Sequence, residues 1–214
     1  MYDAVEINPN FTGNILHIQM KFLQLLKKNI FLVVWTILVA LLLFVPAAKA
    51  FVLRGLIQVG FFKASTGKEN IPGNAPSFSF INRNGQTLTT GDLKGKVVFI
   101  NFWASWCPPC IAEMPSINSL YNKLKDNPRV LFVCVDADSD FSGSIPFMEK
   151  HHYDLPVYNM LNSVPPSFFS GTLPTTIIIN PNGNIVQKHE GIANYDTIEM
   201  LNFLRSLELT GHKE

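Results

Sequence analysis

The sequence lacks an excess of charge of either sign. It has 17 lysines and arginines against 16 aspartates and glutamates, so the formal net charge is only +1. A nucleic-acid surface needs clustered basic side chains, and the sequence has no basic stripe of that kind. It also lacks internal repeats and low-complexity segments. We therefore expect no nucleic-acid partner, and 214 residues suffice for one sizeable domain with additional segments.

Cysteine is also scarce. Three cysteines are an odd number, which argues against a disulfide scaffold and favours one pair with a third thiol left over. A structural zinc site needs four ligands, and the sequence has neither a second CxxC motif nor a suitably spaced Cys/His pair. His151 and His152 are adjacent and have no partner set, so we expect no bound metal ion.

The pair itself is Cys107 and Cys110, in the string Trp-Cys-Pro-Pro-Cys that follows an apolar run over residues 97–102. The run is typical of a strand buried on both faces. At the start of a following helix, unpaired backbone N–H groups and the helix dipole would stabilise a thiolate at Cys107. Cys110 would lie one turn later, close enough to form a disulfide. The motif predicts dithiol redox chemistry that needs no cofactor beyond this disulfide.

An uncharged stretch of 20 residues, 29–48, lies between Lys28 and Lys49. About 20 apolar residues cross a bilayer as a helix, and every face of this helix would be apolar. Ala48-Lys49-Ala50 resembles a signal-peptide cleavage site. The run is long for a signal, however, and 28 residues precede it, so we favour an uncleaved single-pass anchor. Residues 1–28 form the expected cytoplasmic tail, with a start at Met20 as the open alternative.

Basic residues do not orient this anchor. Three precede it and three follow it: Lys21, Lys27 and Lys28, then Lys49, Arg54 and Lys63. The positive-inside rule therefore gives no direction. The redox pair decides instead, because disulfides form and persist outside the cytoplasm. We expect the inner (cytoplasmic) membrane, with the C-terminal domain on the periplasmic or extracellular side.

Residues 49–74 would connect the anchor to the soluble domain. Residues 51–62 are apolar but too few to span, and Arg54 and Gln58 are four apart, on one face of a helix. We interpret this part as a helix lying at the membrane interface; a continuation of the anchor is the alternative. Residues 65–74 are typical of a polar linker, and the domain would cover residues 75–214.

Within residues 75–214, periodicity predicts alternating strands and helices. The expected strands cover residues 78–80, 97–102, 130–135, 175–179 and 185–187, and the expected helices cover 110–124, 145–153 and 198–207. Pro115 should kink the first helix. Strand, helix and strand between residues 97 and 135 form a right-handed βαβ unit. A turn at residues 180–184 makes the last two strands antiparallel, so the fold class is α/β with a mixed sheet.

Several of these strings together resemble one family. The matching stretches are Ala75-Pro76-Ser77-Phe78, residues 93–110, Glu113-Met114-Pro115 and Leu173-Pro174-Thr175-Thr176. The domain resembles the TlpA/ResA-like group, bacterial thiol-disulfide oxidoreductases with a membrane anchor, over about two thirds of the chain. The resemblance implies a thioredoxin fold, a central mixed sheet flanked by helices, preceded by an N-terminal transmembrane helix.

Roles for the site residues follow from the motif and from this resemblance. Cys107 is the expected nucleophile, and Cys110 is the more buried resolving thiol. The resemblance implies that Pro174 is cis and packs against the disulfide, while Leu173 offers backbone hydrogen bonds to a substrate. It also implies that Glu113 accepts the proton of Cys110, because Asn101 stands where thioredoxin has a buried aspartate. A solvated surface carboxylate is the alternative for Glu113.

The remaining expectations concern the surroundings of the pair. Pro108 and Pro109 carry no backbone N–H, which predicts a moderately depressed thiolate pKa and a fairly reducing pair. Together with Trp106, Leu173 and Pro174, they would contact the substrate. Asn101 is expected to be structural, and Cys134, within an apolar strand, to be a buried free thiol.

The expected function is reduction of disulfides in exported proteins, for example in cytochrome c maturation. An upstream membrane thiol electron donor would supply the electrons, and the N-terminal helix would contact the membrane. Two alternatives stay open: an oxidant or isomerase on the same fold, and a copper-delivery or other metal-binding module. The spacing of Cys107 and Cys110 argues against the module, whose relatives use a CxxxC pair.

Overall fold

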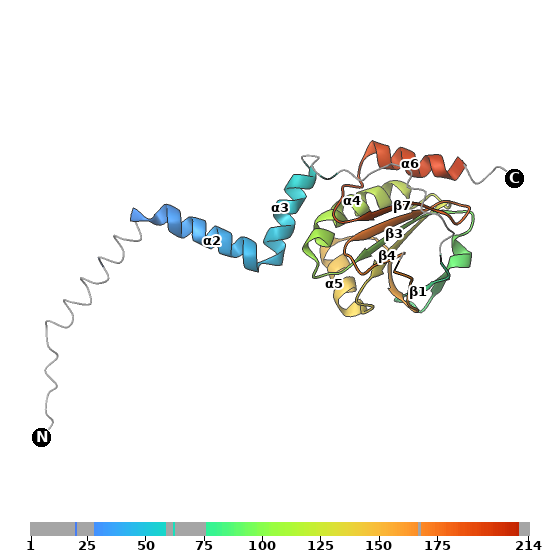
Figure 1. Cartoon of the computed structure of the whole chain (residues 1–214), viewed down its shortest axis with the longest axis horizontal. Helices are drawn as coiled ribbons and strands as arrows, with labels where there is room; N and C mark the ends of the chain where they lie inside the picture. Colours follow the sequence, from blue (N-terminus) through green and yellow to red (C-terminus); the bar gives the residue numbers. More distant parts are fainter. Residues whose placement is uncertain (1–19, 21–27, 59–61, 63–75, 167, 210–214) are drawn as a thin grey trace, which may run out of the picture. The chain divides into compact units, whose positions relative to one another are not determined.

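The computed structural model describes residue 20, residues 28–58, residue 62, and residues 76–166 and 168–209. The chain divides into two compact units, Met1–Val45 and Pro46–Glu214. The sheet and the redox pair both belong to the second unit (Figure 1). Residues 1–19 and the whole predicted linker, residues 65–74, lie outside the described residues.

Helix α2 (Ile30–Phe44) is the described helix of the first unit. It is apolar on every side and none of its residues is buried. We predicted one uninterrupted helix over residues 29–48, but α2 ends at Phe44 and Val45 is extended, with φ −104° and ψ 109°. The physical reason is Pro46, because a residue that precedes proline is disfavoured in the helical region. Fifteen residues span only about 22 Å.

This break bears on the membrane prediction. Within the described ranges, no single helix has the length and apolar character needed to cross a bilayer. Residues of α2 and of α3 (Pro46–Gln58) pass that test only as a pair, by length and composition. Such a pair is weak support for a span, because signal sequences meet the same criteria.

A mixed sheet of seven strands forms the centre of the second unit, in the order β2-β1-β5-β4-β3-β6-β7. The strands are β1 (Ser79–Asn82), β2 (Thr87–Thr89), β3 (Val97–Trp103), β4 (Val130–Asp136), β5 (Val157–Met160), β6 (Thr175–Ile179) and β7 (Ile185–Glu190). The β3/β4 and β4/β5 pairs are parallel and the others are antiparallel. The predicted mixed sheet is confirmed, and β2 and β5 are the strands that we did not predict.

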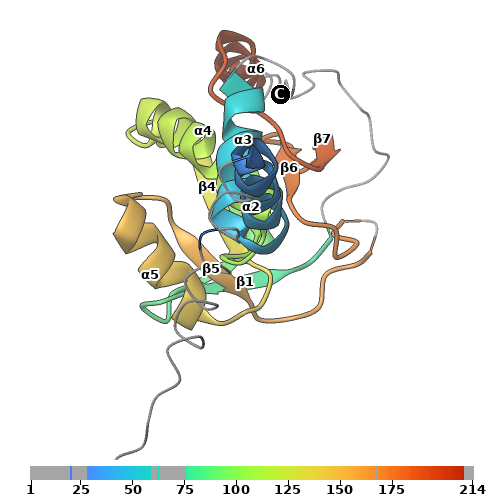
Figure 2. The same ribbon diagram turned by 90° about the vertical axis from the view of Figure 1, so that its left-hand side faces the viewer.

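Two apolar cores lie on the two faces of β3, whose residues are all buried. One core joins Val97, Phe99 and Trp103 to α4 (Pro108–Leu124), α5 (Phe141–His151) and α6 (Ile198–Glu208). Figure 2 shows α4 and α5 next to each other at the side of the sheet. The other core joins the alternate β3 side chains to the short helix η1 (Thr90–Leu93) and to aromatic residues near Phe168. Burial on both faces explains the continuous apolar run of β3.

Helix α3 packs against α4 within the second unit. Ala50 and Ile57 form a small buried cluster with Ala112 of α4. Arg54, which we expected on the same helix face as Gln58, donates a hydrogen bond to the carbonyl of Ile111. The exposed side of α3 carries Phe51, which is 77% exposed. The position of this helix at a membrane interface stays a prediction.

The second core generates a prediction about stability. Phe102 is fully buried, and its ring stacks on Phe169 and contacts Phe80 and Phe168. We expect Phe102→Ala to lower the free energy of unfolding by about 3–5 kcal/mol, because it removes apolar burial and leaves a cavity. Denaturant unfolding of the detergent-solubilised chain measures this. Ile198→Ala, at a side chain that is 74% exposed, is the control and should change it by less than about 0.5 kcal/mol; equal losses would contradict the core assignment.

Candidate active site

Cys107 and Cys110 form a disulfide where β3 gives way to α4, with their Cα atoms 5.3 Å apart. Cys107 is the N-cap of α4, and its Sγ accepts a hydrogen bond from the Cys110 N–H at 3.4 Å. Pro108 and Pro109 occupy the first helical positions, where a missing N–H costs the helix nothing. The Cys110 amide is therefore the first N–H of this helix that can reach the sulfur, as the two prolines led us to expect.

In the disulfide form, the two cysteines differ only slightly in their exposure to solvent. Cys107 is 3% exposed and Cys110 is fully buried. We expected a more open Cys107. Trp106 is instead the prominent surface group beside the pair, with 61% of its area exposed. Its indole Nε1 donates to Asp138 Oδ2 at 2.6 Å; we did not predict Asp138, although it follows β4 at the sheet edge where β3 ends.

The Leu173–Pro174 peptide bond is cis, as the resemblance implied. Pro174 immediately precedes β6, and Thr175 pairs with Phe102 of β3, so the proline lies beside the end of the strand that leads to Cys107. The Pro174 carbonyl accepts a hydrogen bond from the Gly191 N–H at 2.8 Å. Pro174 is buried, whereas Leu173 is half-buried.

Glu113 is completely buried on α4, one turn after Cys110. Its Oε1 accepts from Asn101 Nδ2 at 2.8 Å, and its Oε2 accepts from the Ala193 N–H at 3.2 Å. Burial raises the pKa of this carboxyl from 4.5 to about 8, against the two hydrogen bonds, which lower it. The alternative of a solvated surface carboxylate is therefore wrong.

Asn101, for which we expected a structural role, holds two side chains of the site. Besides Glu113, its Nδ2 contacts Thr176 Oγ1 at 3.0 Å, in the strand register that pairs these two residues. Tyr195 is also fully buried, and burial followed by the nearby Glu113 charge raises its pKa well above 10. Sequence reasoning missed Thr176, Ala193 and Tyr195 as neighbours of Glu113. Only the Pro-Thr-Thr string offered a signal, because it follows the cis proline.

The third cysteine fits its prediction. Cys134 is a buried free thiol, and burial followed by the charge of Glu113 raises its pKa to about 12. It is therefore an unreactive thiol at neutral pH. His151 packs against the rings of Phe147 and Tyr153. Within the described part of the chain, no three potential metal-ligating side chains come together.

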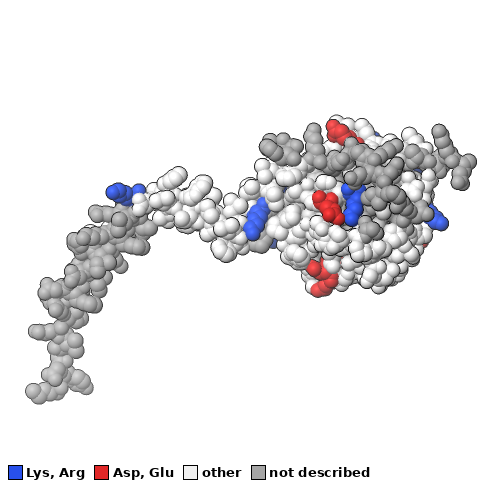
Figure 3. Space-filling model, viewed as in Figure 1, with Lys and Arg blue, Asp and Glu red and all other residues white. Residues whose placement is uncertain are grey.

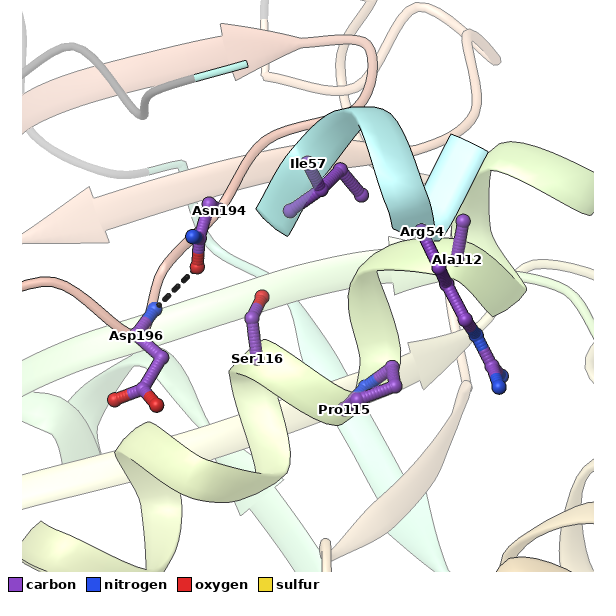
Figure 4. A pocket seen from close by; sticks show the side chains of 7 residues that line it. All are labelled: Arg54, Ile57, Ala112, Pro115, Ser116, Asn194 and Asp196. Atoms are coloured by element: carbon purple, nitrogen blue, oxygen red, sulfur yellow. Dashed lines mark hydrogen bonds between the residues drawn. The ribbon is translucent and has the colours of Figure 1, made fainter. Parts of the chain in front are cut away.

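On the face seen in Figure 3, the described charged side chains are few and form no cluster of one sign. A pocket of about 210 Å³ lies between α3, α4 and the segment that precedes α6 (Figure 4). It is lined by Arg54, Ile57, Ala112, Pro115, Ser116, Asn194 and Asp196.

Comparisons with known proteins agree with this geometry. The family model described as Redoxin matches residues 71–201. The chain is 33% identical to the thiol-disulfide oxidoreductase ResA of Bacillus subtilis (strain 168) over 149 residues, 68% of this chain and 83% of that protein. It is also 33% identical to ResA of Bacillus anthracis over 162 residues, 75% of this chain and 90% of that protein.

Solved structures show the same fold. A Chlorobium tepidum protein assigned as the thiol:disulfide interchange protein DsbE is similar, with a TM-score of 0.54 and 25% identity over 63% of this chain and 95% of that one. A Bacteroides vulgatus protein assigned as a thiol-disulfide oxidoreductase has a TM-score of 0.54 and 26% identity, over 65% and 98% of the two chains. The thioredoxin-like α/β fold, with helices flanking a mixed sheet, is therefore established.

The buried carboxyl predicts an unusual dependence of stability on pH. Since the folded-state pKa of Glu113 is raised, the native state keeps a proton that the unfolded state releases above about pH 4.5. Its contribution therefore makes the fold less stable as pH rises from about 4.5 to about 8, and has no further effect above that. Glu113→Gln removes this term, so its stability relative to the natural chain should rise by a few kcal/mol, at about 1.4 kcal/mol per pKa unit.

Denaturant unfolding of both chains at several pH values measures the difference, in which all other titrating groups cancel. A Glu149→Gln variant, at a surface carboxylate whose side chain is 68% exposed, is the control and should run parallel to the natural chain. A difference between Glu113→Gln and the natural chain that stays constant from pH 5 to pH 8 would contradict the raised pKa.

Proposed function

Because the chain belongs to the Redoxin family and is a thiol-disulfide oxidoreductase of the ResA type, we propose that it reduces disulfides in exported proteins, as in cytochrome c maturation. The proposal rests on three features together: the Cys107–Cys110 disulfide at the start of α4, the cis peptide bond before Pro174 at the start of β6, and Glu113, buried one turn after Cys110. The first exchanges electrons, the second borders the exchange site, and the third can hold or release one proton.

The reaction starts from the reduced pair. The Cys107 thiolate attacks one sulfur of a substrate disulfide; a new S–S bond forms, the substrate bond breaks, and one substrate thiolate leaves. Where Glu113 is ionised, which becomes common as the pH approaches its pKa of about 8, its carboxylate takes the proton of Cys110, and the Cys110 thiolate attacks Cys107 Sγ. The second substrate sulfur leaves as a thiolate, and the Cys107–Cys110 disulfide forms. The substrate gains two electrons and the enzyme loses two, which an upstream membrane thiol donor returns.

The environment of Glu113 suits this proton transfer. Its pKa of about 8 lies close to the ordinary thiol value of about 8.5. Proton transfer between groups of similar pKa is nearly balanced in free energy, so Glu113 can take the proton from Cys110 and later release it. An ordinary surface carboxylate, with a pKa near 4.5, would be a far weaker acceptor.

The substrate surface comprises the groups that surround the disulfide. Trp106 is the most exposed of them, and Pro108, Pro109 and Leu173 are half-buried around it. The Leu173 backbone pairs with an extended substrate segment, and the cis Pro174 keeps that backbone next to the disulfide. These side chains are uncharged, which suits contact with an unfolded apolar segment around a disulfide rather than with a charged partner.

The chain works at the inner membrane, tethered by its N-terminal region. We retain the division into a cytoplasmic tail (1–28), a single-pass anchor (29–48), a juxtamembrane segment (49–74) and the thioredoxin-like domain (75–214). The apolar surface of α2, in which no residue is buried, supports an anchor. The catalytic domain faces the periplasm or the extracellular side, where substrate disulfides form.

A covalent trap tests the direction and the order of the chemistry. With the reduced full-length chain in detergent and insulin as the substrate, the natural chain should reduce insulin. Cys110→Ser should accumulate a disulfide adduct with insulin that dithiothreitol releases, because the resolving thiol is missing. Cys107→Ser is the matched control and should trap none. Equal trapping by both variants, or a reduction potential near −120 mV, typical of a strong oxidant, would contradict the proposal.

Labelling in intact cells tests the location. A membrane-impermeant maleimide should modify Cys107 in the Cys110→Ala variant from outside the cytoplasmic membrane, and the chain should stay with the membrane after alkaline carbonate washing. The buried Cys134 should not react, so a Cys107→Ala/Cys110→Ala chain supplies the background. Labelling that requires lysis of the cytoplasmic membrane would place the domain in the cytoplasm and overturn this part of the proposal.

A further inference from the structure

Helix α4 contains a backbone carbonyl that its own helix cannot satisfy. Pro115 lies inside α4 and has no N–H, so the carbonyl of Ile111, four residues earlier, has no helical donor. Arg54 of α3 fills this place, because its Nη2 donates to the Ile111 oxygen at 3.1 Å. The contact joins residues 57 positions apart. A proline in one helix thus creates the acceptor for an arginine of another.

Apolar contacts surround this hydrogen bond. Ala50 and Ile57 of α3 are buried against Ala112 of α4, and Ile111 and Ile192 pack against the same cluster. Among the described residues Arg54 forms no ion pair. Besides the effect of burial, its charge lowers the pKa of His151, which places the guanidinium towards the end of α5. The helix is therefore held by one directed polar contact and a small apolar patch.

A second contact is made by Phe62, which follows α3 in the sequence, with the segment that precedes α6. The carbonyl of Phe62 accepts a hydrogen bond from the Asn194 N–H at 2.8 Å. The preceding residue, Ala193, donates its N–H to Glu113, and Gly191 donates its N–H to the carbonyl of Pro174. Figure 4 shows Arg54 and Ile57 on one side of the pocket and Asn194 and Asp196 on the other.

We propose that α3 is a working part of the redox site, and that Arg54 is a positioning residue that fixes the α4 turn bearing Cys110 and Glu113 by closing the carbonyl left open by Pro115. This rests on the proposed role of Glu113 as the proton acceptor. Three contacts of α3 and Phe62 fall on a neighbour of a site group: Ile111 beside Cys110, Ala112 beside Glu113, and Asn194 beside Ala193. Helix α3 thereby controls the access of water to the Glu113 carboxyl.

Undocking of α3 would change Glu113 in a definite direction. Water would enter from the pocket side, and burial is the largest influence on the carboxyl, exceeding the hydrogen bonds from Asn101 and Ala193. Its pKa should therefore fall, even if the Ala193 contact weakens. The other titrating groups around Glu113 are Cys110 on α4, Cys134 on β4 and Tyr195 before α6. The facing Asn101 and Thr176 carry no charge.

The test uses the full-length chain in lipid nanodiscs. Arg54→Ala should shift the acidic limb of the pH profile for the Cys110 resolving step to lower pH by about one unit. Amide hydrogen exchange at residues 111–116 and 191–196 should become about tenfold faster while exchange in β3 and β4 is unchanged. Arg54→Lys, which keeps one donor, should restore much of both. Lys49→Ala is the control, since it removes the same charge from α3 outside this contact.

A double-mutant cycle makes the test specific. Pro115→Ala supplies the missing N–H, so the helix can satisfy the Ile111 carbonyl by itself. In that background Arg54→Ala should shift neither the pH limb nor the local exchange. Equal effects of Arg54→Ala in both backgrounds, or none in the natural one, would overturn the proposal. If Arg54→Ala unfolds the chain, the pH profile of Arg54→Lys in the two backgrounds decides.

These experiments distinguish a failure of the inference about Arg54 from a failure of the proposed function. Glu113→Gln should abolish the acidic limb in every background, and this result would assign the limb to the titration of Glu113. If the natural chain fails to reduce insulin or Glu113→Gln leaves the limb unchanged, the proposed function or the role of Glu113 fails. Local exchange in the four chains of the cycle still shows whether Arg54 secures α4. If the natural chain is active and the cycle is additive, only the inference about Arg54 fails.

Discussion

The rest of the site depends on keeping one ionisable carboxyl away from water. Glu113 is fully buried on the helix that begins at the redox pair, and among the described residues two donors reach it: the Asn101 carboxamide and the Ala193 amide. Two neutral donors do not offset the loss of hydration, so the acid form persists to about pH 8. Burying this carboxyl lowers the stability of the fold at neutral pH, because the unfolded chain would release the proton.

Much of the domain follows from local patterns in the sequence. The apolar runs of β3 and β4 and the apolar spacing of α4 predict the βαβ unit, because a strand buried on both faces admits few polar residues. The strand β5 was missed because it has only four residues, with Asn159 among them. The end of α2 was missed for a different reason: the apolar count over residues 29–48 took no account of the local effect of Pro46.

The site was predictable as far as its motif reaches. WCPPC and the Pro-Thr string located the disulfide and the cis proline. The surroundings of Glu113 could not be read in the same way, since Ala193 lies 80 positions away and acts through its backbone N–H, which every residue except proline has. Likewise, Arg54 in the sequence is an ordinary basic residue near an apolar helix. Its contact with Ile111 depends on where two helices meet, which neither periodicity nor composition specifies.

The proposed proton acceptor lies on a helix rather than on the strand at Asn101, and this has a structural consequence. A carboxylate at position 101 would lie within hydrogen-bond reach of Glu113, and two buried carboxylates cannot both ionise at low cost. The amide at 101 removes that conflict and donates a hydrogen bond instead. Glu113 shares α4 with Pro115 and with the surface that α3 covers. It lies only two residues along the helix from Ile111, whose carbonyl accepts the Arg54 hydrogen bond.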